Sequence, residues 1–412
     1  MPGTCCRQAG SVGDRPMRIL LTSPTYPPFN SGLGNATAQQ AAALARAGHE
    51  VVVATGGDVR GSRRDEWGVR VETFAVTGAS SWLQPIRGDV GSYVDFLQQP
   101  GWDVVVLNAW QNWATDLALR HLDRIAGRKF VYSHCISTNV FFAHQPLRSL
   151  LRYLAWRPYW WRLSRFMRRL DGVLFLAGGG TDSRFDDLGL ARRCGVPLRV
   201  VPNSLSPAAV KALAVEPAAL EQRDRLLAVG SYQWQKGFDF VLRAYAASGA
   251  RNRIPLHLFG QQHSAYSETL HSLVRELGLD PGCVVFHEGV SGDALVAEYG
   301  RARLLLSGSH TECQPLVLLD ASALGTPFVA RSTGCIAGMP GGMAVTDWRE
   351  MAARIDALEQ DEAQWQALSR AGRQAARDIY HPEPVARLLL AVLAGENDMM
   401  GSEGPAPAPE KL

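Results

Sequence analysis

The feature that most constrains the fold is the alternation of short apolar runs with longer stretches of helical spacing. The first half contains RILLT at 18, VVVAT at 51, VVVL at 104, KFVYS at 129, VLFLA at 173 and LRVVP at 198. The second half contains RLLAVG at 225, PLHLFG at 255, CVVFHEG at 283, RLLLSGS at 303 and PFVA at 327. Parallel strands that are buried on both faces read as continuous apolar runs, and their crossover connections are helices. The pattern therefore predicts an α/β protein with two doubly wound halves.

The length of 412 residues also favours two domains, because single domains usually hold roughly 100 to 200 residues. Residues 202–224 are dominated by proline and alanine and show no buried strand, so we place the linker there. We expect a first domain at 17–205 and a second at 206–378. Open α/β sheets bind ligands beyond the carboxyl ends of their strands, so functional residues are expected in the loops that follow strands.

Composition limits the compartment and the partners. A net charge of +3 without a basic tail gives no indication of nucleic acid, and no apolar window reaches the about 18 residues that a spanning helix needs. The seven cysteines show neither a dense disulfide pattern nor zinc-type spacing, which favours a reducing cytoplasm. Residues 1–16 lack the apolar core of a signal peptide and are expected to be a disordered leader. Residues 396–412 are rich in Gly, Pro and charge and are expected to be a disordered tail.

Two glycines follow the first predicted strand. Gly32 and Gly34 precede an alanine-rich helix, with Asn35 as the expected N-cap and Gly48 at its end. Such a loop lets backbone N–H groups approach an anion, assisted by the helix dipole. A tight strand-to-helix turn explains the same glycines equally well, and the spacing does not fit a dinucleotide site.

A lysine follows the first strand of the second half. Lys236 lies in the stretch from Gly230 to Gly237, before the helical segment FDFVLRAYAA. In a loop that faces the cleft it would neutralise a diphosphate, whereas a lone lysine on the surface is simply solvated. Other motifs are needed to distinguish a diphosphate contact from a solvated surface lysine.

The run from 309 to 327 supplies that context. It follows the strand RLLLS and enters a helix at about Pro315, a residue that suits a first helical turn. The amide groups of Gln314, Leu316 and Val317 would then form an anion site, because the first N–H groups of a helix lack partners within it.

Two acids flank this helix start. Glu312 is expected just outside the helix and Asp320 within it. Carboxylates beside a phosphate site are explained if they accept hydrogen bonds from sugar hydroxyls. The alternative is that Glu312 caps the helix and Asp320 is an ordinary polar residue.

Taken together over 17–395, these features resemble the retaining glycosyltransferases of family 4, which have the GT-B fold. The resemblance rests on paired prolines before the glycine loop, GHEV, a histidine after a strand in the first half, VPN near the linker, Lys236–Gly237, FHEGV and a run similar to E-x7-E. It implies two Rossmann-like domains facing each other across a cleft. It also implies that the helix at 379–395 packs back on the first domain.

The resemblance assigns roles to individual residues. Glu312 would contact the donor sugar, Asp320 the ribose, and Lys236 the diphosphate, while His134 in VYSHCIS would lie near the reacting sugar. Without the resemblance, a buried structural role for this histidine is the alternative. The glycines at 32, 34 and 230 and the amides at 314, 316 and 317 complete the expected donor site.

Two departures from the family pattern concern donor binding. Ser231 stands where the family commonly has an arginine, and Asp320 is one methylene shorter than the usual glutamate. We therefore expect either a compensating basic residue or weaker binding of the donor.

The function implied is transfer of a hexose-type sugar, with retention, from a nucleotide diphosphate sugar to an acceptor hydroxyl. The acceptor class suggested is lipid-linked or cell-envelope glycan, in polysaccharide or glycolipid synthesis. No cofactor or metal is expected, because no D-x-D motif is present, and Asp186 and Asp187 in FDDL are expected to be solvated. The alternatives are an epimerase or a sugar phosphorylase of the same fold, or a noncatalytic scaffold.

The segment 148–169 is the strongest local charge anomaly. It carries seven arginines, three tryptophans and two tyrosines, and no acid. That composition is typical of a surface at an anionic membrane, here the inner face of the plasma membrane. The alternative is a helix whose aromatic side chains pack on the sheet. Pro158 is expected to break or restart this helix.

Overall fold

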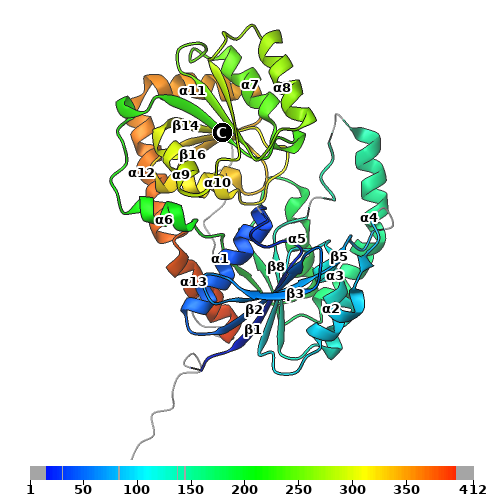
Figure 1. The fold of residues 1–412 in the computed structure, drawn as a ribbon. Helices are drawn as coiled ribbons and strands as arrows, with labels where there is room; N and C mark the ends of the chain where they lie inside the picture. Colours follow the sequence, from blue (N-terminus) through cyan, green and yellow to red (C-terminus); the bar gives the residue numbers. More distant parts are fainter. Residues whose placement is uncertain (1–14, 30, 82–83, 137, 143–144, 396–412) are drawn as a thin grey trace, which may run out of the picture.

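The computed structural model describes residues 15–29, 31–81, 84–136, 138–142 and 145–395. The predicted disordered tail and almost all of the predicted leader lie outside the described residues. The described chain forms two α/β bodies, each built around its own sheet (Figure 1). The predicted pair of doubly wound halves is thereby confirmed.

The first sheet has eight strands in the order β10-β9-β8-β7-β1-β2-β4-β3, all parallel except for the β3–β4 pair. Its strands are β1 Arg18–Ser23, β2 Glu50–Gly56, β3 Gly61–Arg64, β4 Arg70–Phe74, β7 Val104–Asn108, β8 Arg128–Ser133, β9 Gly172–Phe175 and β10 Leu198–Val200. A small antiparallel pair joins β5 Val76–Thr77 and β6 Arg87–Gly88.

The second sheet has six parallel strands in the order β13-β12-β11-β14-β15-β16. They are β11 Arg225–Val229, β12 Leu256–Gly260, β13 Val284–Glu288, β14 Ala302–Ser307, β15 Phe328–Arg331 and β16 Gly342–Val345. The chain runs outward from β11 in both directions, so the strand order reverses between β11 and β14.

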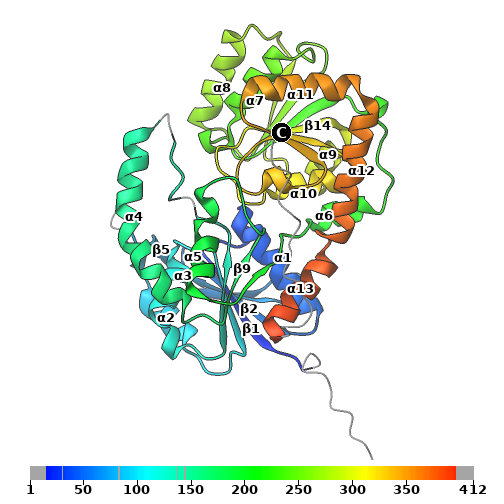
Figure 2. The ribbon, with the colours of Figure 1, turned by 180° about the vertical axis from the view of Figure 1, so that it is seen from behind.

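Helices cover both sheets (Figures 1 and 2). The first body contains α1 Gly32–Arg46, α2 Val90–Leu97, α3 Trp113–Arg120, α4 Pro146–Met167 and α5 Asp186–Cys194. The second contains α6 Pro207–Leu213, α7 Phe238–Ala247, α8 Ala265–Glu276, α9 Gly292–Arg301, α10 Leu316–Ala323, α11 Trp348–Gln360 and α12 Glu362–Asp378. The last helix, α13 Pro382–Ala394, contacts α1 of the first body and buries Leu389 and Leu393 there.

The amino end of α1 corrects the expectation for the glycine loop. The helix begins at Gly32 itself, and Ser31 rather than Asn35 is the N-cap, because its Oγ accepts from the N–H of Gly34 at 3.0 Å. A Cβ at position 34 would stand 2.9 Å from that Oγ, so glycine permits the close cap. The predicted helix end is confirmed, since Gly48 follows the cap with a positive φ of 89°.

The basic aromatic segment forms the single helix α4, and the predicted break at Pro158 is wrong. Pro158 lies on the exposed side of the helix. A proline inside a helix leaves the carbonyl four residues earlier without its N–H partner, and on an exposed face water can satisfy that carbonyl.

The chain crosses between the bodies twice, and the two crossings are joined. The first crossing lies near Leu205, before α6, and the second lies near Tyr380, between α12 and α13. The N–H of Leu205 donates to the carbonyl of Tyr380 at 2.8 Å. One buried apolar cluster contains residues of both bodies, and a second lies on the other face of the second sheet.

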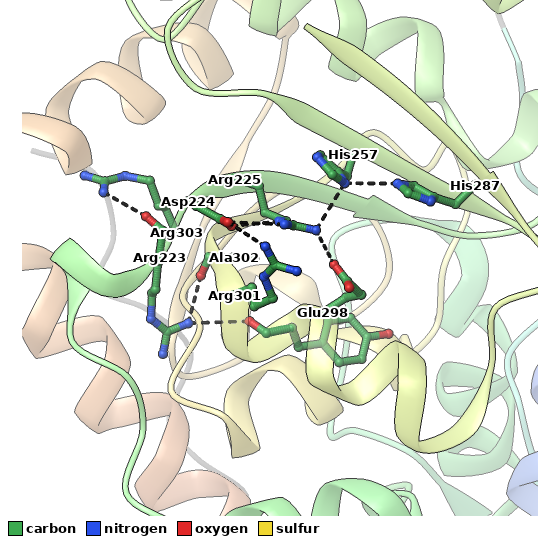
Figure 3. A network of polar contacts seen from close by, with 10 residues as sticks. Arg223, Asp224, Arg225, His257, His287, Glu298, Arg301, Ala302 and Arg303 are labelled. Atoms are coloured by element: carbon green, nitrogen blue, oxygen red, sulfur yellow. Dashed lines mark hydrogen bonds and ion pairs between the residues drawn. The ribbon is translucent and has the colours of Figure 1, made fainter. Parts of the chain in front are cut away.

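A polar network braces the start of β11, at the amino end of the strand (Figure 3). The buried Arg223 donates to the carbonyls of Ala302 at 2.8 Å and Leu324 at 2.9 Å. Arg225 pairs with Glu298 at 2.5 Å and approaches His257. These charges hold the base of the second sheet and do not face its carboxyl edge.

Candidate active site

The residues proposed for donor binding meet at the point where the strand order of the second sheet reverses. Lys236 lies in the loop after β11, and Glu312 lies in the loop after the neighbouring β14. The two side chains form an ion pair, with Lys236 Nζ 2.6 Å from Glu312 Oε1. In open α/β sheets such a reversal leaves a crevice where ligands bind.

Two glycines allow the lysine loop to reach this position. Gly237 has a φ of +59°, and a Cβ there would lie 2.0 Å from the carbonyl oxygen of Gly308, so only glycine fits. At Gly230 a Cβ would stand 3.1 Å from the Cγ of Lys236. The lysine stem therefore lies directly over Gly230.

Glu312 is mostly covered and is held by two donors. Its side chain is 13% exposed, and Oε1 accepts from Ser309 Oγ at 2.9 Å in addition to Lys236. These two contacts fix the carboxylate in the loop between β14 and α10, beside the amino end of α10.

The helix α10 begins one residue after the predicted start, with Pro315 as its N-cap. Pro315 supplies no side-chain cap, so the first-turn N–H groups of Leu316 and Val317 keep the vacant donors that a helix start provides. The Gln314 side chain has a separate role, because its Oε1 accepts from the N–H of Asn203 at 2.6 Å, while donor binding by its backbone N–H stays a prediction. That contact fastens the helix start to the first body just before the first crossing.

Asp320 lies within α10 and contacts the crossing segment. Its Oδ1 accepts from the N–H of Ser206 at 2.9 Å. Burial raises the pKa of Asp320 to about 6, against the hydrogen bond from Ser206, which lowers it. Contact with a ribose stays a prediction for this residue.

His134 directly follows β8 at the carboxyl edge of the first sheet. Its Nε2 lies 3.4 Å from Asn108 Oδ1, at the end of the neighbouring β7. Burial lowers the pKa of His134 to about 4, so the imidazole is neutral at physiological pH. Three non-glycine residues near His134 have a positive φ, in the left-handed region; they are Ala109, Gln111 and Cys135. Such conformations in non-glycine residues cluster at functional sites.

Asp187 corrects another expectation, because it is fully buried while Asp186 is exposed. Asp187 accepts from Trp110 Nε1 at 2.9 Å and from Ser133 Oγ. Burial raises its pKa to about 6. It therefore helps to hold the end of β8, from which His134 projects.

Two arginines near the loop 309–312 were missed from the sequence. Arg184, from the first body, donates to Thr311 Oγ1, and Arg331, at the end of β15, has Nη1 2.7 Å from His310 Nδ1. Neither belongs to a motif. The only signal for Arg331 was its position at the end of a predicted strand, and Arg184 gave none.

Several contacts cross from one body to the other at this site. Cys135, next to His134, forms a disulfide with Cys313, next to Glu312, with a Cα–Cα distance of 5.8 Å. The rings of Phe142 and Trp234 meet edge to face at 5.0 Å. The cysteines are 178 positions apart in the sequence, and nothing in the sequence indicated their pairing.

Other site classes find no support in the described ranges 15–29, 31–81, 84–136, 138–142 and 145–395. They contain no cluster of three or more histidine, cysteine, aspartate or glutamate side chains arranged to hold a metal ion. Within the same ranges no helix has the length and apolar character to cross a membrane.

Both halves of the chain match known protein families. Residues 31–182 match the family described as Glycosyl transferase 4-like domain, and residues 223–361 match Glycosyl transferases group 1. The two matches cover the two bodies in the order in which they occur along the chain.

Curated relatives carry the name D-inositol 3-phosphate glycosyltransferase. The protein of Corynebacterium aurimucosum is 36% identical over 124 residues, which are 29% of this chain and 28% of that protein. The protein of Arthrobacter sp. is 28% identical over 225 residues, 48% of this chain and 51% of that protein. The matches thus span about half or less of the relatives' length.

Solved structures show the same two-body arrangement. Sucrose-phosphate synthase from Thermosynechococcus elongatus superposes with a TM-score of 0.69 at 18% identity, over 92% of this chain and 99% of that one. HepE from Anabaena, in complex with UDP and glucose, gives a TM-score of 0.64 at 16% identity, over 92% and 100% of the two chains. At these identities the likeness establishes the fold.

Proposed function

Because the chain belongs to the family 4-like glycosyltransferases with the GT-B fold, we propose that it transfers a hexose-type sugar from a nucleotide diphosphate sugar to an acceptor hydroxyl, with retention. The observation that carries the proposal is the Lys236–Glu312 pair at the strand-order reversal, beside the uncapped start of α10. A cation, a carboxylate and vacant N–H groups at one place suit a ligand that joins a phosphate to a sugar.

The diphosphate binds between Lys236 and the first turn of α10. The diphosphate replaces Glu312 as the partner of the Lys236 ammonium, and its oxygens accept hydrogen bonds from the N–H groups of Leu316 and Val317. The positive end of the helix dipole also attracts the diphosphate. Gly32 and Gly34, in the first turn of α1, approach the donor from the opposite body. Gly230 contributes by leaving room for the lysine stem.

Glu312 and Asp320 bind hydroxyl groups of the donor. Once the diphosphate has engaged Lys236, Glu312 is free to accept from the sugar while Ser309 keeps it in place. Asp320 has Oδ1 on the N–H of Ser206, and we assign the ribose hydroxyls to its second oxygen. The shorter side chain at 320 remains tied to the crossing segment, which fixes its direction.

His134 acts near the anomeric carbon as a neutral group. A neutral imidazole both donates and accepts a hydrogen bond, so it can orient the sugar without adding charge to it. The departing diphosphate is stabilised by donors that are in place beforehand, which is the main route to catalysis when no nucleophile is used. The acceptor hydroxyl attacks on the face from which the diphosphate leaves.

The compensating cations for Ser231 are Arg184 and Arg331. Both reach the loop that carries Glu312, one from each body. Their side chains are partly buried, so their charge is screened less than that of a fully exposed arginine.

The names of the relatives support the donor and acceptor classes that we propose. HepE was solved with UDP-glucose as well as with UDP and glucose, which supports a UDP-hexose as donor. The curated relatives named for D-inositol 3-phosphate suggest a phosphorylated polyol to test beside a lipid-linked or cell-envelope glycan acceptor. No cofactor is included in the proposal.

The decisive experiment combines nucleotide binding with product analysis. We expect UDP to raise the thermal midpoint of the protein with concentration, because a ligand that binds only the folded state stabilises it. With UDP-glucose and acceptors, the product should keep the anomeric configuration of the donor by NMR. Conversion of the donor into another nucleotide sugar without any acceptor would instead identify an epimerase. A thermal midpoint that no nucleoside diphosphate changes would favour a noncatalytic scaffold.

The matched variants are Lys236→Ala and Lys211→Ala. Loss of a charge-assisted hydrogen bond costs about 1.5 to 3 kcal/mol, so Lys236→Ala should weaken UDP binding by roughly 10- to 150-fold. Lys211, an exposed lysine on α6 that faces Asp293 at 3.8 Å, is the control and should leave UDP affinity unchanged. Equal affinities of the two variants would contradict the diphosphate site.

We also propose that α4 contacts an anionic membrane, at the inner face of the plasma membrane of a cytoplasmic enzyme. The amino-terminal end of α4 stands away from the first sheet in both views (Figures 1 and 2). Its apolar side chains are uncovered, with exposed fractions of 67% at Leu147, 52% at Leu151 and 54% at Leu154. The exposed arginines of the segment are Arg148, Arg162, Arg165 and Arg168.

Vesicle flotation tests this surface. Binding is expected to vesicles with anionic lipid and not to neutral ones, and salt should weaken it because the attraction is electrostatic. The double variant Arg148→Gln, Arg162→Gln should lose binding, and Arg370→Gln, Arg377→Gln on α12 is the control. Equal flotation of the two variants, or none by the wild type at low salt, would remove the membrane from the proposal.

A further inference from the structure

We propose that Cys135 and Cys313 form a reversible thiol–disulfide site that fixes the two walls of the cleft and stops turnover while the bond is closed. The inference rests on the proposed function, because its effect is argued at the donor site. Besides sugar transfer, the protein would then undergo thiol–disulfide exchange at this pair, with a small-molecule disulfide or dithiol as the other reactant.

The position of the pair is the first argument. Cys135 follows His134 in the first body, and Cys313 follows Glu312 in the second. The bond therefore joins the residues next to the proposed sugar contacts of the two walls, and it holds their Cα atoms 5.8 Å apart. In the proposed function the nucleotide sugar binds between these walls, at the Lys236–Glu312 pair.

The backbone at Cys135 is the second argument. Its φ of 66° lies in the left-handed region, which non-glycine residues seldom adopt. Such conformations persist where the surrounding structure enforces them. Ser133 Oγ supports this turn by accepting from the N–H of Cys135 at 3.2 Å, and it donates in turn to the buried Asp187. The turn that presents Cys135 to the second body is thus built from the first.

Further contacts between the two bodies surround the bond. Arg184 donates to Thr311 across the same boundary, and the N–H of Gly334 donates to Asp182 Oδ2 at 3.1 Å. With the bond closed, Lys236 remains paired with Glu312. In the bonded state the proposed diphosphate contact Lys236 is therefore engaged with the proposed sugar contact Glu312.

The reaction takes place when the bodies separate. Burial raises the pKa of the neighbouring Cys335 thiol to about 12, and Glu312 and Asp182 add to the effect. The closed environment is thus unfavourable to a thiolate, which is the reactive form in exchange. Separation exposes Cys135 and Cys313 to water and to a small-molecule disulfide.

The exchange balances in two steps. The thiolate of one cysteine attacks the small disulfide, forms a mixed disulfide and releases one small thiol. The second cysteine, as thiolate, then attacks the protein sulfur of the mixed disulfide and releases the second small thiol. The protein pair loses two electrons to the small disulfide, and its two protons leave with the released thiols. A dithiol reverses both steps.

A bond between the two walls stops turnover because it prevents the motion that turnover requires. Loop and domain motions admit substrate and release product in many enzymes, and these steps often limit the rate. A covalent bond between the walls removes the separation that donor entry and nucleoside diphosphate release require. Reduction restores it.

The experiment compares the full chain after treatment with oxidised glutathione and after treatment with dithiothreitol. Formation of the bond is followed by the faster migration of the denatured, looped chain on a non-reducing gel. We expect the oxidised wild type to lose turnover and slow its UDP exchange, and dithiothreitol to restore both. The variants Cys135→Ser and Cys313→Ser should keep the activity of the reduced wild type under both treatments.

The control variant is Cys283→Ser, which removes a free, partly exposed cysteine of the second body. It should respond to oxidation like the wild type. The inference is overturned if the gel shows no Cys135–Cys313 bond, or if the bonded and reduced proteins turn over equally. Failure of the reduced protein to bind UDP would instead contradict the proposed function, so the two failures are distinguishable.

Discussion

At the scale of residues, the proposed donor site depends on side chains that other residues place. Lys236 lies over Gly230, and Glu312 is fixed by Lys236 and Ser309. The ion pair keeps the lysine at the reversal point before any donor arrives. A phosphate then has only to exchange one anionic partner of Lys236 for another.

We predict that Gly230→Ala weakens UDP binding by moving Lys236. The new Cβ would stand 3.1 Å from Cγ and 3.3 Å from Cδ of the lysine, which is closer than ordinary contact. The flexible stem can shift, so the fold should survive while the ammonium leaves its place. Calorimetry with UDP should show reduced affinity at an unchanged thermal midpoint. Gly91→Ala, where a Cβ meets no atom within 4 Å, is the control.

Asp320 gives a prediction for pH. Its pKa is about 6 in the folded protein against an ordinary value of 3.8, so the folded state binds the proton more tightly than the unfolded state. The stabilisation from this proton is fully present below pH 3.8 and is lost as the pH rises through 6. The shift is worth at most about 3 kcal/mol. An asparagine side chain at this position would accept the same hydrogen bond from Ser206 without titrating.

The measurement is urea unfolding of the wild type and Asp320→Asn at about pH 5 and about pH 7.5, on either side of the folded-state pKa. The free energy of unfolding of the variant, relative to the wild type, should increase toward the higher pH. Asp378→Asn, at an exposed site on α12, is the control and should show no such trend. A difference that is the same at both pH values would mean that Asp320 is not destabilised as an anion.

The sequence indicated both residues of the Lys236–Glu312 pair, which lie in continuous motifs, and missed the residues that approach the pair from elsewhere. Lys236, Glu312 and the start of α10 are close in the chain to strand ends, where apolar runs mark the position. Arg184, Cys135 and Cys313 meet only because the two bodies face each other. The burial of Asp187 was equally invisible, since its partners Trp110 and Ser133 are distant in the sequence.

At the scale of elements, α4 shows that a proline need not end a helix when its face is exposed. We predict that Pro158→Ala stabilises the protein. In a helix interior proline is about 3 kcal/mol less favourable than alanine, and part of that amount should be regained. Thermal or urea unfolding should show the gain, while UDP affinity stays the same. A destabilised variant would mean that the helix needs the proline for packing.

The predicted elements were those with buried, apolar strands. All eleven runs named from the sequence correspond to strands. The missed strands include β3, whose residues are all exposed, and β16, which begins with glycine in the sequence GMAV. Strand β3 lies at the edge of its sheet, and because all of its residues are exposed it contains no apolar run that would predict a strand.

At the scale of the whole molecule, the disulfide should stabilise the fold as well as join the bodies. It closes a loop of 178 residues, and the loss of chain entropy in the unfolded state corresponds to about 5 kcal/mol at most. We predict that the thermal midpoint of the oxidised protein exceeds that of the reduced protein. Scanning calorimetry of both forms measures the difference, and it should vanish in Cys313→Ser and persist in Cys283→Ser.

The two doubly wound bodies could be predicted from the sequence because they follow from the alternation of strands and helices, and the family could be predicted from the order of its motifs along the chain. The contacts across the cleft could not. They depend on the angle at which two separately folded bodies meet, and no local pattern encodes that angle.

The hydrogen bond between Leu205 and Tyr380 holds the two crossing segments side by side. A body connected to another by two adjacent strands of chain can rotate about the line through them more easily than it can slide or twist. Rotation about that line is therefore the relative motion of the bodies that we expect, and a distance measured between two labels across the cleft would follow it. Every group on the walls moves along an arc about the same axis, so the contacts that the two bodies make across the cleft separate together.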